Sequence, residues 1–142
     1  EEEWTWQKRG DPVLHIELRK WADVLLIAPL SANTMAKIVH GLCDNLLTLI
    51  VRCWNFNDRV DGMLKYPIIV CPAMNNLMYD NPITRRQIDA LKEMGIRVVG
   101  PIEKKLMCGE VGNGAMEEPH KIVAFLVQLK TIAISPNLPL DI

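Results

Sequence analysis

The sequence predicts an α/β fold in which a parallel sheet carries helices on both faces. Three short apolar segments, residues 24–28, 68–71 and 96–99, are typical of buried parallel strands. The first two end at prolines, Pro29 and Pro72, and helical patterns separate the three segments. Ligands bind at the carboxyl ends of the strands in such sheets, so we expect a site directly after these prolines.

Composition limits the possible classes of protein. The 142 residues are 49% hydrophobic, enough for one domain with a sizeable core. A net charge of -1 gives no basic surface for nucleic acid. The apolar runs are too short to span a bilayer, and no secretory signal opens the sequence. The four cysteines form no CxxC pair or zinc pattern, so we expect a reduced, cytoplasmic protein without a metal.

Five helical segments are bounded by capping residues, prolines or glycines. They are residues 14–22; Ser31 to about His40, ended by Gly41; Asn45 to about Trp54, capped by Asp44; Pro82 to Gly95, capped by Asn81; and Pro119 or His120 to about Leu129. Between them we expect a surface loop over 55–66 and a glycine-containing loop or irregular hairpin over 105–116. The tail, 133–142, is expected to be loosely ordered.

Two strand ends carry similar polar residues. Leu30-Ser31-Ala32-Asn33-Thr34 follows the first strand, and Ala73-Met74-Asn75-Asn76-Leu77-Met78 follows the second. We expect one site built from these neighbouring ends. Each residue also has a purely structural interpretation. Ser31 can simply cap a helix, Asn75 can form an Asx turn, and Met78 can pack into a core.

Four motifs in order connect the sequence with a known family. They are LHIELR at 14–19 before WAD at 21–23, PLSANT at 29–34, PAMNNLMY at 72–79, and MCG at 107–109 leading into GNGAM at 112–116. With them the sequence resembles the homo-oligomeric flavin-containing cysteine decarboxylases, from about Trp4 to Leu129. The nearest branch acts on 4′-phosphopantothenoylcysteine in coenzyme A biosynthesis, because decarboxylases of lantibiotic peptides are not expected to carry the MCG element.

The resemblance implies a flavodoxin-like or Rossmann-like three-layer sheet, with 1–142 as a single domain. Family members begin with a strand, a Gly-Ser turn that helps to hold the FMN phosphate, a helix and another strand. None of these precedes Glu1, and only three strands are clear in the sequence. We therefore expect the chain to match the C-terminal two-thirds of the family domain. The segment 55–66 is longer than the corresponding family loop.

The same resemblance assigns roles around an FMN cofactor. His15 would be the general base, since an imidazole titrates at about 6.5. Cys108 would reprotonate the enethiolate, since a thiol with a pKa of about 8.5 is protonated at neutral pH. Asn75 would hold the substrate carboxylate without neutralising it. The further substrate contacts would be Met78, Met107 and Gly109, and the cofactor contacts would be Ser31, Ala32, Asn33, Thr34, Ala73 and Met74.

Other interpretations of these residues and of the chain stay open. His15 can be a capping or buried histidine, and Cys108 an unreactive loop cysteine. The resemblance implies a homotrimer with FMN and the active site at the subunit interfaces. Alternatively, the chain is a non-catalytic paralogue that inhibits a phosphatase, or the partner of a chain that carries the missing turn. The presence of His15, Asn75 and Cys108 together favours the enzyme.

Overall fold

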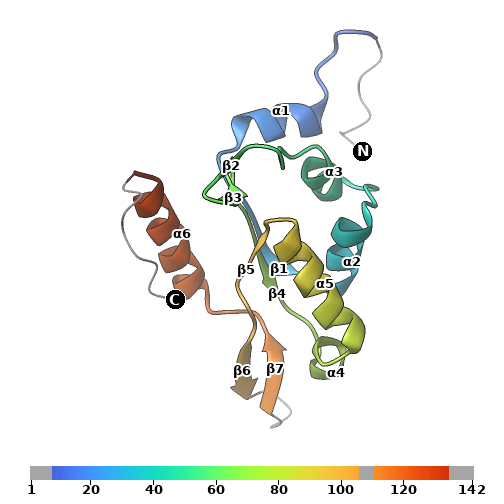
Figure 1. The fold of residues 1–142 in the computed structure, drawn as a ribbon. Helices are drawn as coiled ribbons and strands as arrows, with labels where there is room; N and C mark the ends of the chain where they lie inside the picture. The colour runs from blue at the N-terminus through green and yellow to red at the C-terminus, as the bar shows by residue number, and fades with distance from the viewer. Residues whose placement is uncertain (1–7, 106–110, 135–142) are drawn as a thin grey trace.

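The computed structural model describes residues 8–105 and 111–134, and its centre is a three-stranded parallel sheet. The strands β1 (Leu25–Leu30), β4 (Ile68–Pro72) and β5 (Arg97–Val98) lie in the order β1-β4-β5. Every residue of the central strand β4 is buried, as expected for an apolar strand covered on both faces. The predicted α/β class is confirmed, with helices on both faces of the sheet (Figure 1).

The described residues form six helices, and two of the predicted N-caps are confirmed. They are α1 (Leu14–Trp21), α2 (Ala32–His40), α3 (Leu46–Arg52), α4 (Asn76–Tyr79), α5 (Pro82–Glu93) and α6 (Pro119–Ile134). Ser31 caps α2 and Asn81 caps α5, with Pro82 in the first turn of α5. Gly41 ends α2 in the left-handed conformation that glycine tolerates best.

One predicted cap is wrong. Asn45, not Asp44, caps α3: its Oδ1 accepts a hydrogen bond from the Thr48 amide at 2.9 Å, and the Thr48 hydroxyl completes a capping box. The Asp44 carboxylate instead lies 2.9 Å from Lys37 Nζ on α2. Both residue types cap helices well, so the choice depends on where the neighbouring helix places its lysine. The helix also ends at Arg52 rather than near Trp54.

The predicted surface loop over 55–66 contains a short antiparallel hairpin, β2 (Arg59–Val60) and β3 (Met63–Leu64). Asp61 and Gly62 turn it with positive φ angles, as type I′ turns require. Leu64 is buried in the core, and Arg59 Nη2 donates to the Met94 carbonyl at 3.1 Å. The segment is therefore fixed to the domain, a correction that comes from tertiary contacts rather than local composition.

The core lies between the sheet and helices α2, α3 and α5. Its buried members are Ile27, Leu30, Met35, Ile38, Val51, Trp54, Leu64, Ile68, Val70, Leu91 and Ile96. Cys71 is fully buried too, and burial raises the pKa of its thiol. This confirms the prediction that Cys71 packs as a small apolar residue.

A second antiparallel hairpin lies apart from the sheet, formed by β6 (Ile102–Lys105) and β7 (Val111–Ala115). Figure 1 shows it at the same end of the molecule as α4. The glycine-containing segment is thus a hairpin, one of its two predicted forms. Helix α6 follows and continues to Ile134, past the predicted end at Leu129, so its last residues extend into the predicted tail. The remaining tail lies outside the described residues.

Candidate active site

The carboxyl ends of β1 and β4 lie side by side, as the sequence predicts. Leu30 is paired with Pro72, and the Ala73 amide donates to the Leu30 carbonyl at 3.0 Å. The polar segments that follow the two strands therefore start from neighbouring points at one edge of the sheet. This is the edge at which α/β folds bind their ligands.

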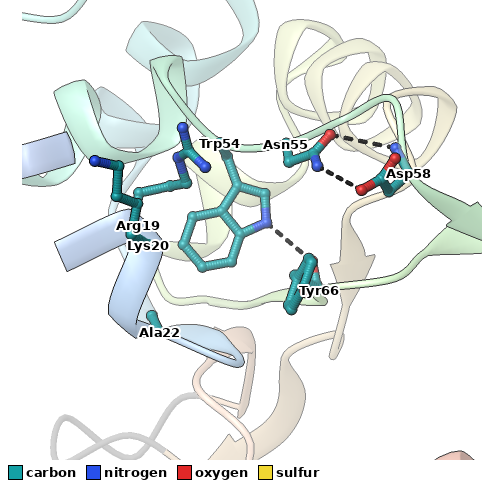
Figure 2. A pocket seen from close by; sticks show the side chains of 7 residues that line it. All are labelled: Arg19, Lys20, Ala22, Trp54, Asn55, Asp58 and Tyr66. Atoms are coloured by element: carbon teal, nitrogen blue, oxygen red, sulfur yellow. Dashed lines mark hydrogen bonds between the residues drawn. The ribbon is translucent and has the colours of Figure 1, made fainter. Parts of the chain in front are cut away.

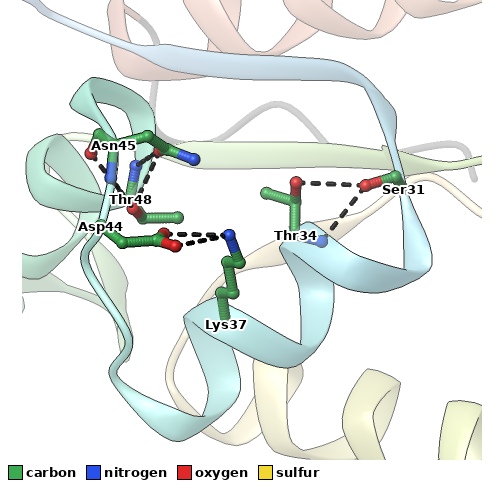
Figure 3. A network of polar contacts seen from close by, with 6 residues as sticks. All are labelled: Ser31, Thr34, Lys37, Asp44, Asn45 and Thr48. Atoms are coloured by element: carbon green, nitrogen blue, oxygen red, sulfur yellow. Dashed lines mark hydrogen bonds and ion pairs between the residues drawn. The ribbon is translucent and has the colours of Figure 1, made fainter.

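The segment after β1 presents the first turn of α2. Ser31 Oγ accepts from the Thr34 amide at 3.2 Å and donates to Thr34 Oγ1 at 3.1 Å (Figure 3). Ser31 is thus a helix cap, and its hydroxyl hydrogen is used within the turn. The hydrogen of the Thr34 hydroxyl remains for another acceptor. Ser31 and Asn33 are exposed, so this turn offers donors to an anionic or electron-rich group.

The segment after β4 orients Asn75. Its Oδ1 accepts from the Leu77 amide at 2.9 Å and caps the single turn of α4. The Asx-turn interpretation is therefore correct, and it does not conflict with binding. Once the oxygen is fixed in the turn, the Nδ2 donors point elsewhere, and no other described residue accepts a hydrogen bond from them. Asn75 is exposed and can donate to an anion such as a carboxylate.

The methionines beside Asn75 differ from each other in environment. Met74 packs against the hydrophobic core, whereas 49% of Met78 and 81% of Leu77 are exposed. Met78 is therefore not a core residue, and its substrate contact stays a prediction. Ala73 and Met74 follow directly after the buried strand β4, and their cofactor contacts stay predictions.

The β6–β7 hairpin packs against the Asn75 segment. The Met74 amide donates to the Gly114 carbonyl at 2.9 Å, and Asn113 Nδ2 donates to Asp80 Oδ1 at 2.9 Å. A Cβ on Gly114 would overlap the Met74 carbonyl oxygen, and one on Gly112 would overlap the Asn76 side chain. At Gly114 the obstacle is backbone, so only glycine permits this approach there. Sequence reasoning read these glycines as turn residues and missed both this contact and the Asp80–Asn113 pair.

The fold therefore brings together three of the four motifs: PLSANT, PAMNNLMY and the GNGAM part of the fourth. Met107, Cys108 and Gly109 lie outside the described residues. They stand in the sequence between the paired strands β6 and β7. Their predicted roles stay predictions.

His15 lies at the other end of the molecule. It is near the start of α1, which packs on α3, and its carbonyl accepts a weak hydrogen bond from Cys53 Sγ at 3.6 Å. Figure 1 shows α1 near the amino end of β1 and α4 beyond the carboxyl end of β4. One copy of the chain therefore does not bring His15 and Asn75 together.

A hollow of about 210 Å³ lies beside the C-terminal end of α1, close in sequence to the amino ends of β1 and β4 (Figure 2). Its lining includes Trp54, Asn55, Asp58 and Tyr66. These groups largely satisfy each other: Trp54 Nε1 donates to the Tyr66 carbonyl at 2.9 Å, and Asn55 Nδ2 donates to Asp58 Oδ2 at 2.8 Å. We interpret the hollow as part of the framework that holds α1 rather than as a ligand site.

Within residues 8–105 and 111–134, no group of three or more histidine, cysteine or acidic side chains is placed to hold a metal ion. No helix in those ranges combines the length and apolar character that crossing a bilayer requires.

Comparison with known proteins identifies the family. The chain is 59% identical over 123 residues to a probable phosphopantothenoylcysteine decarboxylase of Arabidopsis thaliana, covering 86% of this chain and 57% of that protein. It is similar in structure to a PPC decarboxylase complexed with pantothenoylaminoethenethiol, with a TM-score of 0.82, 53% identity, and coverage of 92% and 68% of the two chains. The FMN binding protein AtHal3 gives a TM-score of 0.78 at 54% identity, with coverage of 90% and 65%.

The chain thus spans somewhat more than half the length of the curated relatives that it matches. The model of the family described as Flavoprotein matches residues 1–131. Because that match covers most of the sequence, the chain belongs to the flavoprotein family.

Proposed function

We propose that this chain acts in the FMN-dependent decarboxylation of 4′-phosphopantothenoylcysteine to 4′-phosphopantetheine, a step of coenzyme A biosynthesis. The main support from the structure is the free amide of Asn75 at the carboxyl edge of the sheet, beside the first turn of α2. The relatives named as phosphopantothenoylcysteine decarboxylases, at up to 59% identity, support the choice of substrate.

The residues at this edge fit a flavin. The exposed first turn of α2 supplies donors from Ser31 to Thr34, and Ala73 and Met74 line the adjacent strand end. A similar chain is named as an FMN binding protein. When bound, FMN would supply the two-electron oxidation of the substrate CH2–SH group and the later return of the electrons. The protein supplies orientation and proton transfer.

Asn75 would hold the reacting carboxylate. Its Nδ2 donors bind the anion without giving it a proton, so the carboxylate can leave as CO2. A positively charged side chain would bind the carboxylate more strongly, but it would also stabilise the charge that must be lost. A neutral amide is therefore the suitable group.

His15 and Cys108 would move the protons. His15 would accept the proton released as the CH2–SH group becomes a thioaldehyde. Loss of CO2 then leaves an enethiolate, because the thioaldehyde accepts the electron pair of the broken C–C bond. Cys108 would donate the proton that the carbon takes up as the enethiolate is reduced.

A complete site would need more than one copy of the chain. His15 and Asn75 lie at opposite ends of the protomer, so a head-to-tail contact between copies would bring one copy's His15 to another copy's Asn75. Head-to-tail contacts close into rings when the rotation permits. We propose a homotrimer, in which three such contacts would make three sites.

The test is product formation. The purified protein is incubated with FMN and 4′-phosphopantothenoylcysteine, and mass spectrometry follows the appearance of 4′-phosphopantetheine, whose mass is lower by one CO2. Flavin absorbance of the isolated protein is recorded in parallel. A protein that binds flavin and makes the product supports the proposal. A protein that binds flavin without turnover would favour the non-catalytic alternative, and one that binds no flavin would favour the partner-chain alternative.

A further inference from the structure

Thr84 contacts the segment that carries Asn75 from the side of helix α5. It is the third residue of α5 and is 3% exposed. Its hydroxyl donates a hydrogen bond to the Met78 carbonyl, and its Oγ1 lies 3.9 Å from Met74 Sδ. Met74 and Met78 flank Asn75 in the sequence, so one buried hydroxyl contacts the segment on both sides of the proposed carboxylate ligand.

The segment needs such an anchor because α4 is a single turn of four residues. Short helices are unstable by themselves, since few hydrogen bonds offset the cost of fixing the backbone. Within the turn, the Leu77 amide donates to Asn75 Oδ1 and the Tyr79 amide donates to the Asn75 carbonyl at 2.8 Å. These bonds set the shape of the turn but do not fix its position on the protein.

Contacts with other elements on two sides supply that position, together with the hydrogen bond from Asn113 to Asp80. On one side, the Met74 amide donates to the Gly114 carbonyl of β7. On the other, Thr84 holds the Met78 carbonyl from α5. Both contacts are shielded from solvent, because Gly114 is buried and Thr84 is 3% exposed, so water does not readily replace either of them.

We propose that Thr84 is a positioning residue that sets the direction of the Asn75 Nδ2 donors. It touches neither substrate nor flavin, and it acts through the Met78 carbonyl and the Met74 side chain. This inference rests on the proposed function for its catalytic consequence, but the positional claim can be measured without turnover.

The decisive variant is Thr84→Val, which keeps the shape of the side chain and removes the hydroxyl. Thr84→Ser keeps the hydroxyl. Thr48 offers a matched control: it is 1% exposed, lies on α3, and its hydroxyl donates to the Asn45 carbonyl at 3.1 Å. Thr48→Val therefore removes an equally buried hydroxyl from a helix turn that does not contact the Asn75 segment.

Hydrogen exchange is measured at the Leu77 and Tyr79 amides of the flavin-loaded protein. Thr84→Val should speed exchange there about five- to tenfold, as expected for the loss of one buried hydrogen bond. Thr84→Ser and Thr48→Val should leave those two amides within about twofold of the parent. If Thr84→Val fails to fold, Thr84→Ala is measured against the same criteria. Unchanged exchange at both amides in the folded variant would overturn the proposal.

The second test measures turnover in a double-mutant cycle that combines Thr84→Val with Asn75→Ala. Thr84→Val should lower kcat/KM about tenfold in the parent and have little further effect when Asn75 is already alanine, because coupled residues are not additive. Losses that multiply would show that Thr84 does not act through Asn75. If the parent itself shows no turnover, the proposed function fails, while the exchange measurement still decides the role of Thr84.

Discussion

The two ends of the sheet use their polar groups in different ways. At the amino end, the polar groups beside α1 mostly bond to each other, as Trp54 does with Tyr66 and Asn55 with Asp58. At the carboxyl end, Asn75 uses its oxygen in a turn and keeps its Nδ2 donors for another acceptor. A hollow whose polar groups mostly bond to each other fits a structural role, whereas an edge with fixed but unused donors is suited to binding.

The largest expected effect tests whether His15 at the amino end nevertheless belongs to the chemistry. His15→Asn should lower the rate of CO2 release about 10²- to 10⁴-fold, the usual contribution of a general base. The fold and the flavin content should be kept, because α1 has no buried residues. Steady-state turnover and flavin absorbance of the variant check this prediction. Parental turnover would remove His15 from the mechanism.

Gly114→Ala tests the close packing between the β6–β7 hairpin and the Asn75 segment at the carboxyl end of the sheet. The added Cβ would overlap the Met74 carbonyl oxygen, so the hairpin must move away from the Asn75 segment. We expect a loss of about 1–3 kcal/mol in the free energy of unfolding, as for other overpacked sites, together with reduced turnover. Chemical denaturation and the product assay measure the two effects.

Gly100→Ala is the matched control for that experiment. A Cβ at Gly100 has no atom within 4 Å, so this variant should keep the parental stability and turnover. Equal losses in both variants would mean that close packing at Gly114 is not the cause.

Trp54→Phe probes the framework at the amino end. The substitution leaves the Tyr66 carbonyl without its indole donor, which should lower the free energy of unfolding by about 1–2 kcal/mol. Flavin affinity and the KM for substrate should stay near the parental values, because the hollow is not a ligand site. A selective rise in KM with unchanged stability would show that the hollow binds substrate.

The smallest effect concerns the link between α2 and α3. The hydrogen bond from Lys37 lowers the pKa of Asp44 below its ordinary value of 3.8 (Figure 3). A carboxyl group with a lowered folded-state pKa stabilises the fold above its unfolded pKa and loses that contribution as the pH falls through the folded value. Thermal unfolding of the parent should therefore show a small acid-dependent loss near and below pH 3.8 that Asp44→Asn lacks. Identical pH profiles would contradict this assignment.

Local signals were enough to predict much of the fold. Short stretches of adjacent residues predicted the buried strand at 68–71 and the helix caps at Ser31 and Asn81-Pro82. The structure confirms all three. The sequence predicted Asp44 as the cap of α3, whereas Asn45 is the cap in the structure. This could not be predicted, because Asp44 pairs with Lys37 of another helix. The hairpin within 55–66 depends in the same way on Arg59 reaching Met94.

The sequence predicted which strand ends lie side by side, but not the geometry around them. The sequence placed Asn75 and Ser31 at neighbouring strand ends, because parallel strands bring their carboxyl ends to one edge. It gave no indication that Gly114 packs on Met74, or that Thr84 holds Met78. Nor did the spacing of residues show the separation of His15 from Asn75 within one copy; shared sites at subunit interfaces came only from the family resemblance.

The central claim is that His15 and Asn75 complete one site from different copies of the chain. Mixing the impaired variants His15→Asn and Asn75→Ala and allowing subunits to exchange tests it directly. A hybrid oligomer would hold some contacts that pair an intact His15 with an intact Asn75, about a quarter of them for random mixing in a head-to-tail ring. We predict that turnover returns to about that fraction of the parental rate. Turnover that stays at the level of the separate variants, with exchange confirmed by mass spectrometry, would contradict the account.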